Sequence, residues 1–244
     1  MSDSETAARD PGRERTGSGK EALPAMGVCL GACSVTVARR RGDGLSLESV
    51  PHDGKVEEVL RRVLAEALPA RVVITGRAFR NMVTVPTISE PEAVELAYAS
   101  LRDSLPDIDC ILSAGGETFI AYQLDRNGRI RAVQTGNKCA SGTGEFFLQQ
   151  IKRMGVSLEE AISAAVDAEP YPVAGRCSVF CKSDCTHALN KGLPKGRISA
   201  GLCRMMSGKM VELIKKARAS RILITGGVSR NRVVLDCLRE QYPE

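Results

Sequence analysis

Three glycine turns constrain the possible fold of this chain more than any other feature of its sequence. Ala114-Gly115-Gly116 and Gly226-Gly227 each follow a short apolar run, and Gly142-Thr143-Gly144 opens a helical stretch. Glycine at a strand end or a helix start lets backbone N–H groups approach an anion, and the helix start adds its dipole. A single glycine turn of this kind commonly connects two secondary-structure elements without binding anything. Three of them in one chain favour a nucleotide-phosphate site in an α/β fold.

The apolar pattern gives the order of elements around these turns. Alternating runs over 27–39 and 44–50 predict a hairpin, and 119–125 with 129–135 predict a second one. Short strands are expected at 71–75, 109–113 and 221–225. Helices are expected at 56–68, 90–105, 141–155, 178–191, 197–218 and 231–240, and a further helix begins at the capping box Ser157–Glu160. The order is therefore β-rich, α/β, an all-helical insert, and α/β again.

Composition excludes several classes of function. With 43% apolar residues, 244 residues can bury the core of one or two domains. The absence of Trp and the 4% aromatic content disfavour a stacking surface for single-stranded nucleic acid, and the net charge of +5 is diffuse. No apolar run approaches the roughly 18–20 residues of a membrane span. We expect a cytoplasmic protein that binds neither nucleic acid nor membrane.

Nine cysteines are many for such a chain. Their odd number, without a secretory signal, favours metal or redox use over a disulfide framework. Cys177, Cys181 and Cys185 recur every four residues and lie on one helix stripe, which packing of cysteine as a small apolar residue also explains. A zinc site with His187 is the weaker interpretation, because this spacing matches no usual zinc-finger pattern.

Cys139 differs from the stripe because it stands beside Lys138, just ahead of a glycine loop and a helix start. Positive charge and a helix dipole favour the thiolate, which is the form that binds iron. An iron–sulfur cluster needs four ligands, and the chain has no compact four-cysteine ferredoxin run. Either Cys139 joins the stripe within one subunit, or two cysteines from each of two subunits meet on a symmetry axis.

Five segments carry a resemblance to a known family. They are Gly136-Asn-Lys-Cys-Ala-Ser-Gly-Thr-Gly144, Arg176-Cys-Ser-Val-Phe-Cys-Lys-Ser-Asp184, Leu189-Asn-Lys-Gly-Leu-Pro194, Ala200-Gly-Leu202 and Thr225-Gly-Gly-Val-Ser-Arg-Asn231. From about Gly27 to its end the chain resembles the activator ATPases of 2-hydroxyacyl-CoA dehydratases and the ATPase subunits of benzoyl-CoA reductases. The motifs Lys-Cys-Ala-(Ala/Ser)-Gly-Thr-Gly and Cys-x-Val-Phe are specific to that family.

The resemblance implies an α/β, acetate-kinase/Hsp70/actin-like ATPase fold of two ribonuclease-H-like halves with a helical insert and ATP in the cleft. Residues 1–25 are rich in Ser, Glu, Arg, Gly and Pro without apolar periodicity, so we expect a disordered tail there. From the resemblance we expect the first half over 26–136, and the insert with an incomplete second half over 137–244. The chain stops soon after Thr225-Gly-Gly-Val, short of the strand–helix segment that usually completes the second half.

The family also implies cofactors and partners. One [4Fe–4S] cluster per homodimer is held by Cys139 and Cys177, while Cys181 and Cys185 lie outside the general family pattern. ATP and Mg²⁺ drive transfer of a low-potential electron, received from ferredoxin or flavodoxin, to a 2-hydroxyacyl-CoA dehydratase or benzoyl-CoA reductase type protein. The implied nucleotide-binding residues are Gly31, Gly115, Gly116, Lys138, Gly142, Thr143, Gly144, Gly226 and Gly227.

Two loops depart from the family pattern. The first usually reads Gly-Ile-Asp-x-Gly-Ser-Thr and is here Gly27-Val-Cys-Leu-Gly-Ala-Cys33; the second usually reads Asp-x-Gly-Gly and is here Ser113-Ala-Gly-Gly116. Both lack the aspartate that holds Mg²⁺ and positions the attacking water. Glu117 is the acidic residue left beside the second loop, and we take it as the candidate catalytic residue. The alternatives are a degenerate, non-hydrolysing subunit that binds nucleotide or cluster, and an unrelated actin-fold small-molecule kinase.

Overall fold

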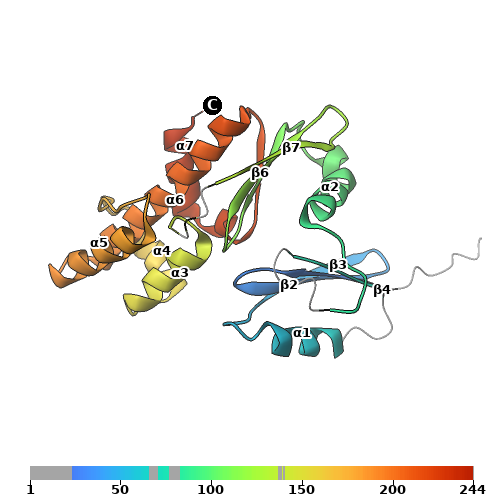
Figure 1. Ribbon diagram of the computed structural model, residues 1–244, viewed down its shortest axis with the longest axis horizontal. Coiled ribbons are helices and arrows are strands. Elements are labelled where there is room, and N and C mark those ends of the chain that lie inside the picture. Colours follow the sequence, from blue (N-terminus) through green and yellow to red (C-terminus); the bar gives the residue numbers. More distant parts are fainter. Residues whose placement is uncertain (1–23, 66–70, 77–82, 137–138, 140, 244) are drawn as a thin grey trace, which may run out of the picture.

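The structure is a computed structural model that describes residues 24–65, 71–76, 83–136, 139 and 141–243. Most of the expected N-terminal tail lies outside the described residues. The described residues form two four-stranded sheets, each with helices packed on it (Figure 1). Each sheet consists of a three-strand antiparallel meander with a fourth strand parallel to the first, so the two halves repeat one plan.

The first sheet has the strand order β3-β2-β1-β4. Its strands are β1 (Ala25–Leu30), β2 (Ser34–Arg41), β3 (Gly44–Pro51) and β4 (Arg71–Thr75). Helix α1 (Val56–Ala65) covers one face, with Val59 and Val63 packed on Val35 and Val37 of β2 in one apolar cluster. The single run expected over 27–39 is divided into β1 and β2, because the chain turns at Gly31, whose N–H donates to Ser34 O at 3.0 Å.

The second sheet has the order β7-β6-β5-β8 and helices on both faces. Its strands are β5 (Cys110–Ala114), β6 (Phe119–Leu124), β7 (Ile130–Thr135) and β8 (Ile222–Thr225). On one side lies α2 (Glu90–Leu101), which continues into a short 3-10 turn and packs Tyr98 against Ile111 and Tyr122. The opposite side is covered by α6 (Lys195–Ala217), against which α7 (Arg232–Gln241) packs (Figure 1).

The pairing of the strands differs from the expected division at residue 136. Strands β5, β6 and β7 lie in the part assigned to the first half, yet they share a sheet with β8, because β5 and β8 run in parallel from Cys110↔Ile222 to Ser113↔Thr225. The first sheet thus ends with β4. Pairing between strands so distant in sequence leaves no local pattern, so the sequence did not reveal that β5 and β8 share a sheet.

The helical part follows the expected order. Its helices are α3 (Gly144–Arg153), α4 (Leu158–Ala165), α5 (Ser178–Asn190), α6 (Lys195–Ala217) and, after β8, α7 (Arg232–Gln241). The predicted capping box of α4 is confirmed, with reciprocal bonds between Ser157 and Glu160.

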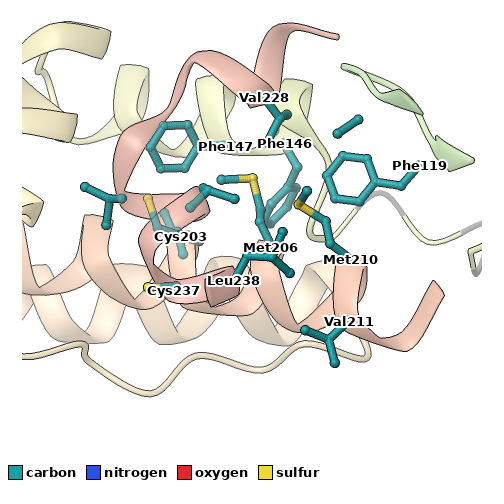
Figure 2. Packing of buried hydrophobic residues seen from close by; sticks show 14 of the residues in the cluster. Phe119, Phe146, Phe147, Cys203, Met206, Met210, Val211, Val228, Cys237 and Leu238 are labelled. Atoms are coloured by element: carbon teal, nitrogen blue, oxygen red, sulfur yellow. The ribbon is translucent and has the colours of Figure 1, made fainter. Parts of the chain in front are cut away.

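Helix α6 is the centre of the larger core. Figure 2 shows Met206 and Met210 of α6 reaching toward Phe146 and Phe119, so flexible thioethers fill the space between rings from α3 and β6. No helix in the described part of the chain combines the length and the apolar character that crossing a membrane requires.

Candidate functional site

The structure brings the turn at Gly115-Gly116 into direct contact with the segment Gly142-Thr143-Gly144. The N–H groups of Gly144 and Glu145, in the first turn of α3, donate to Gly115 O at 3.2 Å and Gly116 O at 2.9 Å. A methyl group on Gly144 would lie 3.1 Å from Gly115 O. The start of α3 is therefore seated on the turn after β5, and these two N–H groups are already used inside the protein.

Gly226 and the first loop complete the same cluster of turns. Gly226 has φ 91°, and a Cβ there would lie 2.5 Å from Ala114 O, so only glycine fits between β5 and the end of β8. A Cβ on Gly116 would lie 2.6 Å from Cys33 Sγ, which places the loop between β1 and β2 against the turn after β5. Glycine segments that are far apart in sequence thus meet at one point between the two sheets.

The other residues predicted for nucleotide binding have different surroundings. Thr143 is the N-cap of α3, and its side chain accepts the N–H of Phe146. Gly142 has φ 83° and packs closely on the Lys209 side chain. Gly227 opens a short 3-10 helix, Glu117 is exposed, and Lys138 lies outside the described residues. These observations leave their predicted roles as proposals.

A carboxylate that the sequence did not suggest stands beside the second loop. Ser113, in the position of the family's aspartate, donates its hydroxyl to Glu90 Oε1 at 3.4 Å. Glu90 is the first residue of α2, which crosses from the first sheet onto the second. The pattern Ser89-Glu-Pro predicted the helix start correctly, but a local pattern does not reveal which strand end that helix faces.

The first loop is also close to an acid. The pKa of the Cys33 thiol is raised, mainly because the side chain is buried and further because the Glu145 carboxylate is near. Cys33, which stands where the family's first loop has threonine, is therefore a neutral thiol at ordinary pH.

The two cysteines predicted as cluster ligands meet at the start of α5. Cys177 is the N-cap residue of this helix and is partly exposed. Cys139 lies near the next residue, Ser178, whose N–H and hydroxyl help to lower the pKa of the Cys139 thiol. The Cys139 and Cys177 loops, far apart in sequence, are thus brought to one helix N-terminus, where the dipole favours negative charge.

Cys139 is the activated thiol of this pair. Its Sγ lies 3.2 Å from Ser141 Oγ. Hydrogen bonds from the Ser141 hydroxyl and N–H, helped by Ser178 and opposed by burial, lower the pKa of Cys139 to about 7. At neutral pH about half of this thiol is thiolate, which is the form that binds iron.

Cys181 and Cys185 lie in the apolar core rather than at this surface. They are 0% and 3% exposed, and Cys181 Sγ contacts Met205 Sδ at 3.9 Å. The pKa of Cys181 is raised by its hydrogen bond with Cys185 and by burial, which disfavours a thiolate. The residues that the structure describes contain no group of three or more His, Cys, Asp or Glu side chains arranged to hold a metal ion, and no disulfide. At the start of α5 one chain therefore offers two accessible thiols, Cys139 and Cys177, which is half of a four-thiolate donor set.

A hollow of about 120 Å³ lies beside the thiol and the start of α3. Its lining includes Cys139, Ser141, Thr143 and, from α6, Lys209 and Lys216. The Glu212 carboxylate also lines the hollow, so the two ammonium groups leave one net positive charge, which favours an anion nearby.

Comparison with known proteins identifies the family of this arrangement. The BadF/BadG/BcrA/BcrD ATPase family matches residues 48–244. One of the subunits of benzoyl-CoA reductase from Thauera aromatica is 27% identical over 142 residues, 57% of this chain and 50% of that protein. The 2-hydroxyisocaproyl-CoA dehydratase activator of Clostridioides difficile is 26% identical over 175 residues, 70% of this chain and 64% of that protein. The chain thus spans about half to two thirds of the length of these relatives.

A solved structure supports the fold. The activator of the 2-hydroxyisocaproyl-CoA dehydratase from Clostridium difficile, solved with bound ADPNP, superposes with a TM-score of 0.77 at 22% identity and covers 91% of this chain and 86% of that one. The expected actin-like ATPase fold is therefore confirmed.

Proposed function

The chain belongs to the BadF/BadG/BcrA/BcrD ATPase family, and from this premise we propose that it is an ATP-dependent activator. It passes a low-potential electron to a 2-hydroxyacyl-CoA dehydratase or a benzoyl-CoA reductase type protein. Relatives that bear the name of dehydratase activator or of reductase subunit support this kind of partner.

The meeting of Cys139 and Cys177 at the start of α5 is the observation that carries the proposal. Cys177 caps the helix, and Cys139 lies on its first residue with a pKa of about 7. Two accessible thiols from each of two copies supply four thiolates, the set that a [4Fe–4S] cluster requires. Such a cluster, when bound, accepts and releases single electrons at low potential.

The residues of the chain divide the remaining tasks. Cys139 and Cys177 of each subunit hold the metal centre, and the helix dipole of α5 offsets its negative charge. The glycine turns at Gly115, Gly116 and Gly226 let the nucleotide phosphates approach the backbone, with Gly31, Gly142, Thr143, Gly144, Gly227 and Lys138 around them. Ferredoxin or flavodoxin supplies one electron, which leaves to the partner protein, while ATP and water become ADP and phosphate.

Hydrolysis requires an acid that orients water and Mg²⁺, and Glu90 is our candidate. Its carboxylate lies 3.4 Å from Ser113 Oγ, where the family's second loop carries an aspartate. Glu117 is the second candidate, being next to the same turn but exposed. Carboxylate oxygens are the protein ligands that Mg²⁺ prefers.

A non-hydrolysing subunit is the competing function, and one observation favours it. Cys29 and Ser113 occupy the positions of both loop aspartates. A thiol or hydroxyl does not hold Mg²⁺ as a carboxylate does. Such a protein binds nucleotide or cluster without turnover.

Anaerobic purification tests the cluster. We expect a brown wild-type protein whose iron falls to background in Cys139→Ser and in Cys177→Ser, whereas Cys29→Ser, which changes an exposed cysteine of the first sheet, keeps its iron. A colourless, iron-free wild type under reducing, iron-replete conditions contradicts the cluster.

Hydrolysis of ATP with Mg²⁺ by the reduced protein separates the two functions. We expect a rate above that of a Lys138→Ala/Thr143→Ala double variant. Equal rates for the two proteins support the non-hydrolysing subunit.

A further inference from the structure

The sulfur of Cys139 is surrounded by two serines. Ser141 Oγ lies 3.2 Å from Cys139 Sγ. The Ser141 N–H and, to a lesser extent, the N–H and hydroxyl of Ser178 also lower the pKa of this thiol. Ser141 is 2% exposed, so its hydroxyl depends on protein partners rather than on water.

Ser141 has a second partner, on the loop of the other cysteine. Its hydroxyl donates to Gly175 O at 3.0 Å, and Gly175 precedes Cys177 by two residues. The side chain therefore bridges the Cys139 loop and the Cys177 loop. Because a serine hydroxyl has one hydrogen but two lone pairs, it accepts from the Cys139 S–H while it donates to Gly175 O. A thiolate sulfur has no hydrogen to give, so toward it the same Ser141 hydrogen has to turn from Gly175 O to the sulfur.

The two hydroxyls are features of this chain rather than of the general motifs. Position 141 is the one that takes either alanine or serine in Lys-Cys-Ala-(Ala/Ser)-Gly-Thr-Gly, and position 178 is the variable residue of Cys-x-Val-Phe. The cysteines alone therefore do not account for this network.

We propose that Ser141 is a positioning residue that fastens the two cysteine loops together in the metal-free protein. With a cluster held by the cysteines, its hydroxyl hydrogen turns to the Cys139 sulfur and, with Ser178, sets the reduction potential of the cluster. The second part rests on the proposed function, whereas the bridge between the loops does not. Hydrogen bonds to ligand sulfurs stabilise the more negative, reduced state and so raise the potential. The serines make the electron easier to load and less strongly reducing.

Redox titration followed by electron paramagnetic resonance tests the effect on potential. We expect a more negative midpoint in Ser141→Ala, a further shift in Ser141→Ala/Ser178→Ala, and recovery in Ser141→Thr, which retains a hydroxyl. Ser199→Ala is the matched control, since Ser199 is also buried and its hydroxyl has no partner among the described residues. An unchanged midpoint in the double variant overturns the electrostatic role. If the Ser141 variants do not fold, the midpoint potential of Ser178→Ala, a change at a partly exposed position, decides the electrostatic role.

Hydrogen–deuterium exchange of the metal-free protein tests the bridge without any cluster. Peptides covering residues 170–178 exchange roughly three- to tenfold faster in Ser141→Ala than in wild type or Ser199→Ala, because one hydrogen bond is lost. Unchanged exchange in this segment overturns the bridge. An iron-free wild type that still shows the exchange difference contradicts the proposed function and leaves the bridge standing.

Discussion

The cysteine pair at the start of α5 and the glycine loops differ in which chemical groups they present. At the start of α5 the reactive atoms themselves are present, with Cys139 and Cys177 brought together and one of them activated. At the glycine loops the backbone shape is present, down to the close approach of Gly226 to Ala114, but Cys29 and Ser113 replace the acids.

The difference separates two requirements that usually occur together. Binding of phosphate depends on backbone N–H groups and hence on glycine, whereas hydrolysis depends on carboxylates that hold Mg²⁺ and orient water. A chain can therefore retain the first while the second moves to another residue or disappears. The following experiments either remove this contrast or make it sharper.

The largest expected effect is the difference in bound iron between a variant of the ligand Cys177 and a variant of Cys181, one helical turn further along α5. Cys177→Ala loses all bound iron, while Cys181→Ala keeps it, because Cys181 is a fully buried core residue. Iron and acid-labile sulfide per protein are the measurement. Iron loss in Cys181→Ala of a protein with wild-type secondary structure would return the cluster to the helix stripe.

The shape of the glycine loops is tested by two adjacent glycines. Gly226→Ala lowers the free energy of unfolding by about 2–4 kcal/mol, since it combines positive φ with a clash on Ala114 O. Gly227→Ala, where a Cβ meets nothing within 4 Å, changes it by less than about 1 kcal/mol. Chemical denaturation of both variants is the measurement, and equal losses would remove the argument for a tight fit at Gly226.

The missing acids are tested at Glu90. Glu90→Gln lowers the rate of ATP hydrolysis roughly ten- to hundredfold, as for loss of a group that orients water, and leaves nucleotide affinity nearly unchanged. Glu117→Gln is the comparison, because that side chain is exposed beside the same turn. A larger loss in Glu117→Gln would reverse the assignment. Equal rates in all three proteins would leave the loops without a catalytic acid.

The smallest effect concerns the pH dependence of the metal-free thiol. Alkylation of Cys139 by iodoacetamide is half-maximal near pH 7, below the range of an ordinary thiol. A depressed pKa in the folded state adds stability above the unfolded pKa of about 9 and loses it as pH falls through about 7. Peptide mapping of alkylated Cys139 across pH is the measurement, and a midpoint near pH 9 contradicts the thiolate.

Local patterns predicted most elements of the fold. The capping box at Ser157, the strand over Arg71–Thr75 and the helix that opens at Glu90 needed only neighbouring residues. The grouping of β5 with β8 could not be predicted this way, since the two strands are separated by the whole helical part. The same applies to the turn at Gly31, where two alternating strands read as one continuous run.

The residues of the candidate site likewise fall into those that local sequence predicted and those that only the fold reveals. Cysteine type and motif spacing pointed to Cys139 and Cys177, and the structure brings them to one helix start. Ser141, Ser178 and Glu90 carried no such signal, because their partners Gly175 and Ser113 become neighbours only after folding. Side chains whose role is to touch a distant loop are visible only in three dimensions.

The packing of the start of α3 on the turn at Gly115-Gly116 has a mechanical consequence. The N–H groups of Gly144 and Glu145 hold the carbonyls of Gly115 and Gly116, and Ser141, three residues before Gly144, holds the Cys139 sulfur. A displacement of that turn by a phosphate group would pull on the helix start and, through less than one helical turn of chain, on the sulfur. Three residues of chain therefore separate the helix start that contacts the glycine turn from the serine that contacts the Cys139 sulfur.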